Sequence, residues 1–358
     1  MNKPKILIEM EKLRNLNSGL GQFCLGLGHA LCEQQKKFDL YFLVPKNREG
    51  IFGIHARYLK LKSHLSFLFN RPKNYEVWHC THQESKFLPR KGKLILTIHD
   101  LNFLYKYKGL KKQWKLYALQ RKVNSAVAVT AISKFTAEEI KRHLRIDEKK
   151  LYVIYNGVSV KTDDTDALPD MLKNQAYLFT IGIINPKKNF HVLLPLLSAR
   201  KDLKLVIAGN NNHHYVQEIK DLASKMGVSS QVHMLGIVSD ALKFTLYQHC
   251  YAFVFPSLSE GFGLPVIEAM LFGKPVFLSN NTCLPEIGGS EAFYWKNFNA
   301  EDMLQVFERG MKTYQNDQLK VARIKAHAAQ FTWEKSAAAY LSLYERVAAE
   351  GSSKNCNQ

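Results

Sequence analysis

The stretch Tyr251-Ala-Phe-Val-Phe-Pro-Ser-Leu-Ser-Glu-Gly-Phe-Gly-Leu-Pro-Val-Ile-Glu-Ala-Met-Leu-Phe-Gly-Lys-Pro275 decides how the chain is interpreted. Its opening residues, up to Phe255, form a short apolar run that is typical of a buried strand. Gly261 and Gly263 follow, and a second apolar segment then begins near Pro265. Proline suits the first turn of a helix, and a glycine shortly after the last apolar residue ends one. The stretch therefore predicts a strand, a glycine loop and a helix.

Two carboxylates flank the start of this predicted helix. Glu260 precedes it, and Glu268 lies roughly 5 Å along its axis, about one turn in. A helix N-terminus binds anions because its unpaired N–H groups and its dipole point at the ligand. Carboxylates beside such a site suit a ligand with both phosphate and hydroxyl groups. The alternative is that Glu268 only balances the helix dipole, and the spacing alone favours neither.

The length and composition are those of a globular protein. A chain of 358 residues favours two domains over one, and its hydrophobic fraction of 46% is ordinary. No apolar run reaches the roughly 18 residues that a membrane span needs, and no charged-then-apolar leader opens the chain. We therefore expect the protein to stay in the compartment where it is made. The cysteines contain no Cys-x-x-Cys pair, which indicates neither a zinc site nor a redox motif and suits a reducing cytosol: Cys24, Cys32, Cys80, Cys250, Cys283 and Cys356.

The positive charge is confined to the first half. Residues 1–161 contain 31 Lys and Arg against 12 Asp and Glu, whereas the remaining residues contain 19 of each. The whole formal charge of +19 therefore lies in the first half. Such asymmetry indicates an anionic partner for that half, either nucleic acid or a membrane surface.

The first half predicts alternating strands and helices on a parallel sheet. A strand at Lys5–Glu9 is followed by the loop Asn17-Ser-Gly19-Leu-Gly21 and by a helix through Phe23–Leu31. The loop lacks the G-x-G-x-x-G pattern, so a nicotinamide enzyme is not expected, although its glycines could approach a phosphate. A simple tight turn explains the loop equally well. Further strands are predicted at Asp39–Val44, Tyr75–His79, Lys93–Ile98 and Ala126–Thr130.

Ligands of such sheets bind beyond the carboxyl ends of the strands. Several polar residues fall at or just after these ends: His79, His82, His99 and Asp100. His99 and Asp100 are the best placed of them for chemistry, although a single histidine is more often structural.

The segment Tyr105–Lys122 mixes Lys and Arg with Tyr, Trp and Leu and contains no Asp or Glu. Cations interleaved with aromatic residues fit docking on an anionic lipid surface. Nucleic-acid binding uses the same residue types, and a solvated basic helix face is the third explanation.

The pattern starts again after a turn at Asn156-Gly-Val and a polar acidic stretch that ends near Asp170. Strands are predicted at Ala176–Gly182, Leu203–Ala208 and Val232–Leu235, with helices at Phe190–Leu197 and Tyr215–Met226. Lys187 and Lys188 follow the first of these strands and could neutralise a diphosphate, although two solvent lysines are the commoner explanation. A helix capped by Thr332 closes the fold.

The order of several motifs matches one family. Glu260 to Glu268, in the context S-E-G-F-G-L-P-x-x-E-A-M, is similar to an E-x7-E element, and residues 182–189 resemble a G-x-x-x-P-R-K-N phosphate loop. Thr97–Leu101 resembles T-x-H-D-L, Ser18–Gly21 a first glycine loop, and Trp333–Tyr344 a terminal crossing helix. Together they resemble the retaining, nucleotide-sugar-dependent glycosyltransferases of the GT-B fold, family four.

This resemblance implies an α/β fold with two Rossmann-like, doubly wound domains, a cleft between them and a C-terminal helix that crosses back. The implied division is an acceptor-binding domain over 1–165, a nucleotide-sugar-binding domain over 166–332, a crossing helix over 333–350 and a tail over 351–358.

The resemblance also assigns roles to residues. Glu268 would accept hydrogen bonds from the ribose, while Glu260 would lie at the donor sugar and phosphates together with the amides of Gly261, Phe262, Gly263 and Leu264. Lys188 and Lys187 would stabilise the diphosphate, and Lys187 stands where relatives often carry arginine, without its bidentate fork. Gly19 and Gly21 would approach the phosphates, His99 would lie near the reaction centre, and Gly236 and Ile237 would hold the nucleobase.

The implied reaction moves a hexose from GDP-mannose or a UDP-hexose to a hydroxyl of a glycan or lipid-linked acceptor, with retention and without a metal or other cofactor. Asp164-Thr-Asp166, the nearest Asp-x-Asp, lies in the linker rather than at a strand end. Lysines and backbone amides would instead meet the diphosphate charge. The basic first half then fits a cytoplasmic enzyme held peripherally on the inner face of the membrane, in lipopolysaccharide, capsule or exopolysaccharide synthesis.

Two alternatives remain. A sugar-nucleotide epimerase or a phosphorylase can share this fold, although the E-G-F-G-L-P context argues against the epimerase and no lysine recommends a phosphorylase. A nucleic-acid-binding protein is the less favoured alternative, because the sequence contains no nucleic-acid module.

Overall fold

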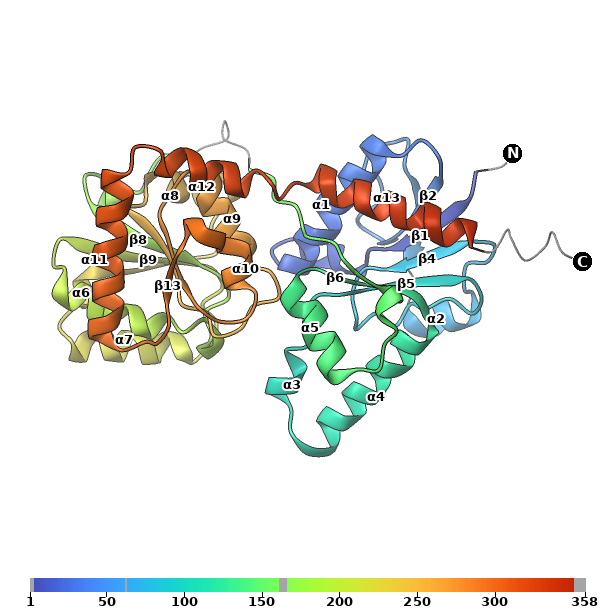
Figure 1. The fold of residues 1–358 in the computed structure, drawn as a ribbon, viewed down its shortest axis with the longest axis horizontal. Coiled ribbons are helices and arrows are strands. Elements are labelled where there is room, and N and C mark those ends of the chain that lie inside the picture. Colours follow the sequence, from blue (N-terminus) through green and yellow to red (C-terminus); the bar gives the residue numbers. More distant parts are fainter. Residues whose placement is uncertain (1–2, 62, 161–165, 351–358) are drawn as a thin grey trace, which may run out of the picture. The chain divides into compact units, whose positions relative to one another are not determined.

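The structure is a computed structural model that describes residues 3–61, 63–160 and 166–350 (Figure 1). The chain divides into two compact units. Unit 1 comprises Met1–Val158 and Phe331–Gln358, and unit 2 comprises Ser159–Gln330. The sequence placed the boundary after residue 165, and residues 161–165, like the expected tail 351–358, lie outside the described residues.

Unit 1 contains a parallel sheet with strand order β3-β2-β1-β4-β5-β6-β7. Its strands are β1 (Lys5–Glu9), β2 (Asp39–Pro45), β3 (Arg57–Leu61), β4 (Val77–Cys80), β5 (Lys93–Ile98), β6 (Ala126–Ala131) and β7 (Leu151–Val153). Its helices are α1 (Gly19–Gln34), α2 (His64–Phe69), α3 (Phe103–Lys106), α4 (Gly109–Ser125), α5 (Lys134–His143) and α13 (Trp333–Ala349).

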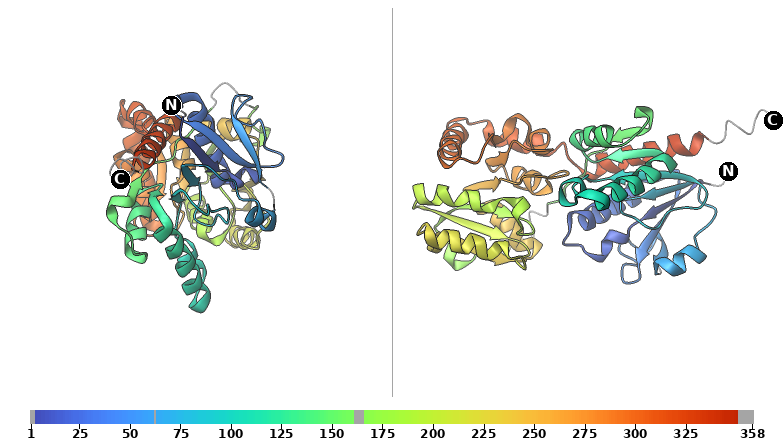
Figure 2. Two further views of the ribbon diagram at one scale, coloured as in Figure 1. Left: turned by 90° about the vertical axis from the view of Figure 1, so that its right-hand side faces the viewer. Right: turned by 90° about the horizontal axis from the view of Figure 1, so that it is seen from below.

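Helices cover both faces of this sheet (Figures 1 and 2). Successive side chains of a strand point to opposite faces, so Ile6 and Ile8 of β1 pack against α1 and α13. Leu7 faces the other way, into a core that includes residues of α4 and α5. Burial on both faces explains why these strands are nearly continuous apolar runs in the sequence.

Unit 2 repeats the design with strand order β10-β9-β8-β11-β12-β13, again parallel throughout. Its strands are β8 (Ala176–Ile181), β9 (Leu203–Ala208), β10 (Val232–Gly236), β11 (Ala252–Phe255), β12 (Val276–Ser279) and β13 (Phe293–Trp295). Its helices are α6 (Leu194–Ala199), α7 (Tyr215–Lys225), α8 (Asp240–His249), α9 (Leu264–Leu271), α10 (Leu284–Gly288), α11 (Ala300–Asn316) and α12 (Lys320–Ala328). The expectation of two doubly wound, Rossmann-like units is confirmed.

The last helix, α13, returns to unit 1, as the sequence predicted. Its side chains join the core beneath α1, and Trp333 packs so tightly there that a Cβ on Gly26 would lie 2.1 Å from its ring. Tyr344 donates or accepts a hydrogen bond of 2.7 Å with Nδ1 of His79. The last helix that the structure describes therefore belongs to the core of unit 1.

Two details of the second half differ from the sequence prediction. The helix expected over Phe190–Leu197 is a 3-10 turn, Phe190–Leu193, followed by α6 from Leu194. Pro195 explains the break, because proline lacks the N–H of an α-helical interior and is accepted in a first turn. Helix α9 begins at Leu264, so Pro265 is its second residue, and Gly273 follows its end with φ +72°.

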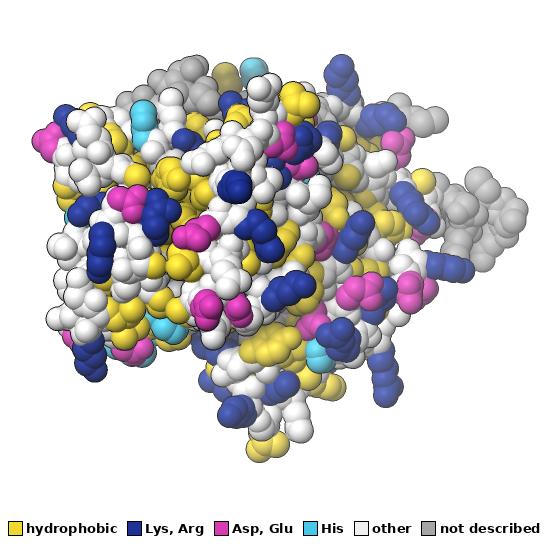
Figure 3. Space-filling view, turned by 60° about the vertical axis from the view of Figure 1, so that its left-hand side comes forward, with side chains coloured by type: hydrophobic (Ala, Val, Ile, Leu, Met, Phe, Trp, Pro, Cys, Tyr) yellow, Lys and Arg dark blue, Asp and Glu magenta, His cyan; other side chains and the backbone are white. Residues whose placement is uncertain are grey.

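Helix α4 is the part of unit 1 that projects furthest from the sheet (Figures 1 and 2). Three large apolar side chains on it, Leu110, Trp114 and Tyr117, are exposed. They follow helical spacing, so they share one stripe. The lower part of the molecule in Figure 3, over α3 and α4, shows Lys and Arg next to hydrophobic side chains. None of the described helices combines the length and apolar character that crossing a bilayer requires.

Each sheet has a point where the strand order reverses direction. In unit 1 it lies between β1 and β4, and in unit 2 between β8 and β11. The loops that leave such neighbouring strands diverge to opposite faces, which opens a crevice at their carboxyl ends where ligands bind.

Candidate functional site

The loop after β8 places two lysines at the switch point of unit 2. Lys187 and Lys188 belong to the 3-10 turn Pro186–Lys188, whose N-cap Asn185 accepts a hydrogen bond from the Lys187 amide. Asn189 ends the turn in the left-handed conformation with φ 59°. Gly182 begins the loop with φ +149°, and a Cβ there would lie 2.9 Å from Cε of Lys188. The backbone at Gly182 therefore lies against the methylene chain of Lys188 and restricts where that side chain can lie.

Lys188 pairs with Glu260 from the loop after β11. The Lys188 ammonium donates to Oε1 of Glu260 at 2.7 Å, and the two side chains are only 12% and 13% exposed. Ser257 Oγ donates to the same oxygen at 2.6 Å, and the ammonium lies 4.6 Å from the centre of the Phe255 ring. Burial alone would raise the pKa of Glu260, but Lys188 and Lys187 outweigh it and leave the pKa below its ordinary value.

The loop between β11 and α9 is shaped by one glycine and by the neighbouring strand end. Gly263 is the N-cap of α9 with φ +99°, where a larger residue would be strained. Thr282, just beyond β12, accepts a hydrogen bond from the Glu260 amide, and the Cys283 thiol donates to the carbonyl of Phe262. The loop that contains Gly261 is thus tied to a third strand end.

Glu268 faces α8. Its Oε2 accepts a hydrogen bond of 2.8 Å from the Tyr247 hydroxyl, and its Oε1 lies 3.2 Å from the Lys243 ammonium. Glu268 is the fifth residue of α9, beyond the first turn in which the helix dipole acts, so the dipole alternative is disfavoured. Tyr247 and Lys243 could not be identified from the sequence, because no motif signals that α8 packs beside α9.

The end of β10 places Gly236 and Ile237 at the same edge of the sheet. Gly236 has φ +70°, and its carbonyl accepts a hydrogen bond of 2.6 Å from the Gly209 amide. Ile237 is exposed. Gly209 is itself packed against the Gly182 carbonyl, since a Cβ there would lie 2.0 Å from that oxygen. The predicted nucleobase residues therefore adjoin the loop that holds the lysines.

The remaining predicted site residues belong to unit 1. Gly19 is the first residue of α1, and Ser18 is the N-cap of this helix. The Gly21 amide donates a hydrogen bond of 3.0 Å to the Ser18 Oγ. A Cβ on Gly21 would lie 2.0 Å from the Asn15 carbonyl oxygen, so local packing by itself requires glycine there. No such contact constrains Gly19 within 4 Å. Contact of either glycine with a phosphate stays a prediction.

His99 lies just after β5 and is buried against the Phe23 ring. Its Nε2 is 2.8 Å from the carbonyl oxygen of Thr81, which can only accept, so Nε2 carries the proton. Burial lowers the pKa of His99 to about 3 and leaves the ring neutral. His79 is structural, because Tyr344 and Thr97 engage its two ring nitrogens.

The structure also brings together three residues that no sequence motif connects. His82, noted only as a histidine near a strand end, lies next to Glu9 and Glu11. The one available signal was that Glu9 ends β1 and His82 follows β4, two strands that prove to be neighbours.

The models of two protein families match consecutive parts of the chain. Residues 23–162 match Glycosyltransferase Family 4, and residues 161–323 match Glycosyl transferases group 1. The first match includes most of unit 1 but neither β1 nor α13, and the second includes most of unit 2, with Lys188, Glu260 and Glu268.

Two relatives from Escherichia coli are mannosyltransferases by name. The serotype-specific mannosyltransferase WbdA of Escherichia coli is 30% identical over 59% of this chain, which spans only 28% of that protein. O-antigen chain mannosyltransferase B of Escherichia coli is 26% identical over 95% of this chain and 99% of its own. The solved structure of Anabaena Alr3699/HepE with UDP-glucose shares the fold, with a TM-score of 0.72 and 18% identity over 94% of this chain and 99% of that one.

Proposed function

Because the chain belongs to the glycosyltransferases with family 4 and group 1 domains, we propose that it moves a hexose from a nucleotide-diphosphate sugar to a hydroxyl group of a glycan or lipid-linked acceptor. The donor would be GDP-mannose or a UDP-hexose. The observation that carries the proposal is the largely buried Lys188–Glu260 pair at the switch point of unit 2, with Glu268 on the helix that starts beside it.

In this proposal each part of the donor meets a different group. The ribose hydroxyls donate to Glu268, whose carboxylate Tyr247 and Lys243 already orient. The diphosphate lies against Lys188, Lys187 and the N-terminus of α9, where unpaired amides and the helix dipole favour negative charge. The nucleobase lies at Gly236 and Ile237. Glu260 positions Lys188 and the sugar, since its lowered pKa keeps it ionised and suits a hydrogen-bond acceptor.

The chemistry proposed is transfer with retention at the anomeric carbon. Positive groups fixed before the reaction stabilise the charge that develops on the departing diphosphate. The acceptor hydroxyl attacks on the face that the leaving group vacates, and the leaving phosphate takes up its proton. Lysines and amides supply the electrostatic stabilisation of the diphosphate, so the proposal requires no metal there. His99, neutral and held by Thr81, would position the donor sugar.

Relatives named as O-antigen chain mannosyltransferases support a role in lipopolysaccharide synthesis. Together with the serotype-specific mannosyltransferase WbdA, they favour mannose among the hexoses. The HepE complex with UDP-glucose supports a nucleotide sugar as donor. Capsule or exopolysaccharide synthesis would use the same chemistry.

A ligand panel tests the proposed function. A ligand that binds the folded state raises the unfolding midpoint, and saturation at about 100 times Kd adds roughly 2.7 kcal/mol of stability. We expect GDP-mannose or one UDP-hexose, with its free nucleotide diphosphate, to raise the midpoint by several degrees. Nucleotide sugars with a different base should have little effect, and the active donor should transfer hexose to a lipid-linked acceptor. Absence of any shift, with transfer to no acceptor, would contradict the proposal.

The acceptor partner is proposed to lie at an anionic membrane surface, reached peripherally from the cytoplasmic side. Trp114, Leu110 and Tyr117 form an exposed stripe on α4, and Lys108, Lys111 and Arg121 are exposed along the same segment. Aromatic and apolar side chains can enter the headgroup region while the cations pair with anionic lipids. The net charge of unit 1 supports a membrane surface in the same way.

A vesicle assay tests this surface. We expect the protein to float with vesicles that contain phosphatidylglycerol and to be released by salt, since the attraction is screened. Replacing Leu110, Trp114 and Tyr117 together by serine should weaken binding at least about tenfold, because each buried apolar side chain contributes roughly 1.5–3 kcal/mol. Leu319→Ser, which removes an exposed apolar side chain from unit 2, is the matched control. Absence of binding at low salt would refute membrane docking and leave the transferase proposal intact.

A further inference from the structure

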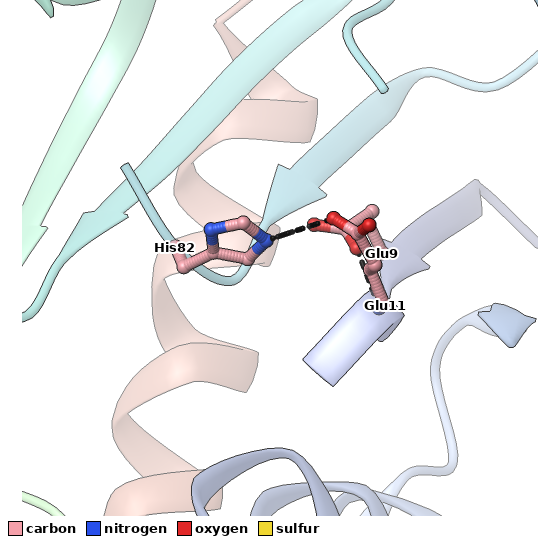
Figure 4. Close-up of side chains that lie close together, drawn as sticks. All are labelled: Glu9, Glu11 and His82. Atoms are coloured by element: carbon pink, nitrogen blue, oxygen red, sulfur yellow. Dashed lines mark hydrogen bonds and ion pairs between the residues drawn. The ribbon is translucent and has the colours of Figure 1, made fainter. Parts of the chain in front are cut away.

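The switch point of unit 1 holds three side chains of the kind that bind metal ions (Figure 4). Glu9 is the last residue of β1, Glu11 opens the 3-10 turn Glu11–Arg14, and His82 follows β4. In Figure 4 the imidazole of His82 and the two carboxylates point toward one another. The group occupies in unit 1 the position that the Lys188–Glu260 pair occupies in unit 2, where doubly wound sheets bind ligands.

Burial makes this group unusual. Glu9 is 0% exposed and His82 is 2% exposed. Glu9 Oε2 and both ring nitrogens of His82 have no hydrogen-bond partner among the described residues. Buried polar atoms are nearly always hydrogen-bonded, and a buried carboxylate requires a compensating charge. Neither carboxylate pairs with a lysine or arginine in the part of the chain that the structure describes.

The distances fit a bridging cation better than direct hydrogen bonds. His82 Nε2 lies 3.6 Å from Glu9 Oε2 and 3.5 Å from Glu11 Oε2, both too long for a hydrogen bond. Tetrahedral zinc with bonds of about 2.0–2.2 Å separates neighbouring ligand atoms by roughly 3.4 Å. The other oxygen of Glu9 accepts the Glu11 amide at 2.5 Å, the kind of outer contact that orients a metal ligand.

From these observations we propose that Glu9, Glu11 and His82 bind one divalent transition-metal ion, with zinc as the best match. One imidazole nitrogen and two carboxylate oxygens suit zinc, which accepts both ligand types, and a fourth position stays open for water. A sugar could not reach Glu9, whereas an ion could enter beside Glu11, whose side chain is 25% exposed. The ion belongs to unit 1 and is not assigned to the donor diphosphate.

Zinc titration of the full chain, stripped with a chelator, tests the proposal. Isothermal titration calorimetry should show one tight equivalent of Zn²⁺, and the unfolding midpoint should rise on binding. Glu11→Gln and His82→Asn should each weaken binding about 10²-fold or more, since removing even an outer-shell partner costs 10–100-fold. Glu11→Gln alters the most exposed of the three ligands, so it is the variant least able to disturb folding.

Glu218→Gln is the matched control, because Glu218 forms an exposed pair with His214 at 3.3 Å that could also attract zinc. It should leave the tight equivalent unchanged. Zinc bound equally by wild type, Glu11→Gln and His82→Asn would be an adventitious ion only and would overturn the proposal. Absence of zinc binding would overturn it too.

Discussion

Lys188→Met should lower kcat for hexose transfer by about 10²–10³-fold, while KM for the donor changes by less than about tenfold. The ammonium is fixed at the switch point by Glu260 and by the Phe255 ring, so it needs no reorganisation as the diphosphate departs. Charge develops on the leaving group chiefly in the transition state, and only interactions that strengthen there raise kcat. Steady-state kinetics with the donor identified by the ligand panel measures both constants.

The variant also leaves Glu260 buried without its partner, and breaking such a pair can cost about 3–5 kcal/mol of stability. The double variant Lys188→Met/Glu260→Gln separates the effects, because it removes both charges. Its unfolding midpoint should recover toward wild type while kcat stays low. Lys201→Met, at an exposed position outside the cluster, is the control for loss of a lysine. A kcat for Lys188→Met within about twofold of wild type would show that Lys188 does not stabilise the departing diphosphate.

Glu268→Ala should raise the Kd of the donor by about 10²-fold or more and change kcat less. Two ribose hydroxyls would lose a charged acceptor, and hydrogen bonds to charged groups contribute roughly 1.5–3 kcal/mol each. The effect should be the same for the free nucleotide diphosphate, because the lost contacts involve the ribose and not the hexose. Titration calorimetry with the donor and with the nucleotide diphosphate measures both.

Tyr247→Phe is the matched control for Glu268→Ala. It keeps the carboxylate and removes the hydrogen bond that orients it, so it should weaken binding about fivefold, in line with the roughly 1 kcal/mol of one hydrogen bond. Glu301→Ala, at an exposed position on α11, should have no effect. If Glu268→Ala bound the donor as tightly as wild type, the ribose would not contact this carboxylate, and the proposed donor site would be wrong.

Much of the fold could be predicted from residue pattern because strands buried on both faces have a strong local signature. Lys5–Glu9, Lys93–Ile98 and Leu203–Ala208 have the predicted bounds for this reason. The short strands β3, β7, β12 and β13 were not predicted. β3, β7 and β13 lie at the edges of their sheets, where residues are less buried and the apolar run is weak. β12 is buried but contains only four residues, too few for a clear pattern.

The grouping of the candidate site residues was predictable where they belong to one local motif. Glu260, Gly263 and Glu268 follow one another around the start of α9, and Lys187 and Lys188 share one turn. Partners from other elements were not predictable. Tyr247 and Lys243 reach Glu268 from α8, a helix whose own sequence contains no functional pattern.

By itself, the sequence determined two doubly wound units, the elements that bear the charged residues, and the confinement of positive charge to the first half. These are local properties, set by periodicity, by glycine and proline, and by counting. Only the tertiary structure decided which charges meet. Strand order brings Glu9 beside His82 and Lys188 beside Glu260, although more than 70 residues separate the members of each pair. Packing also places the Lys188 ammonium against Glu260 and the Tyr247 hydroxyl against Glu268. No single stretch of sequence can encode contacts between separate strands and helices.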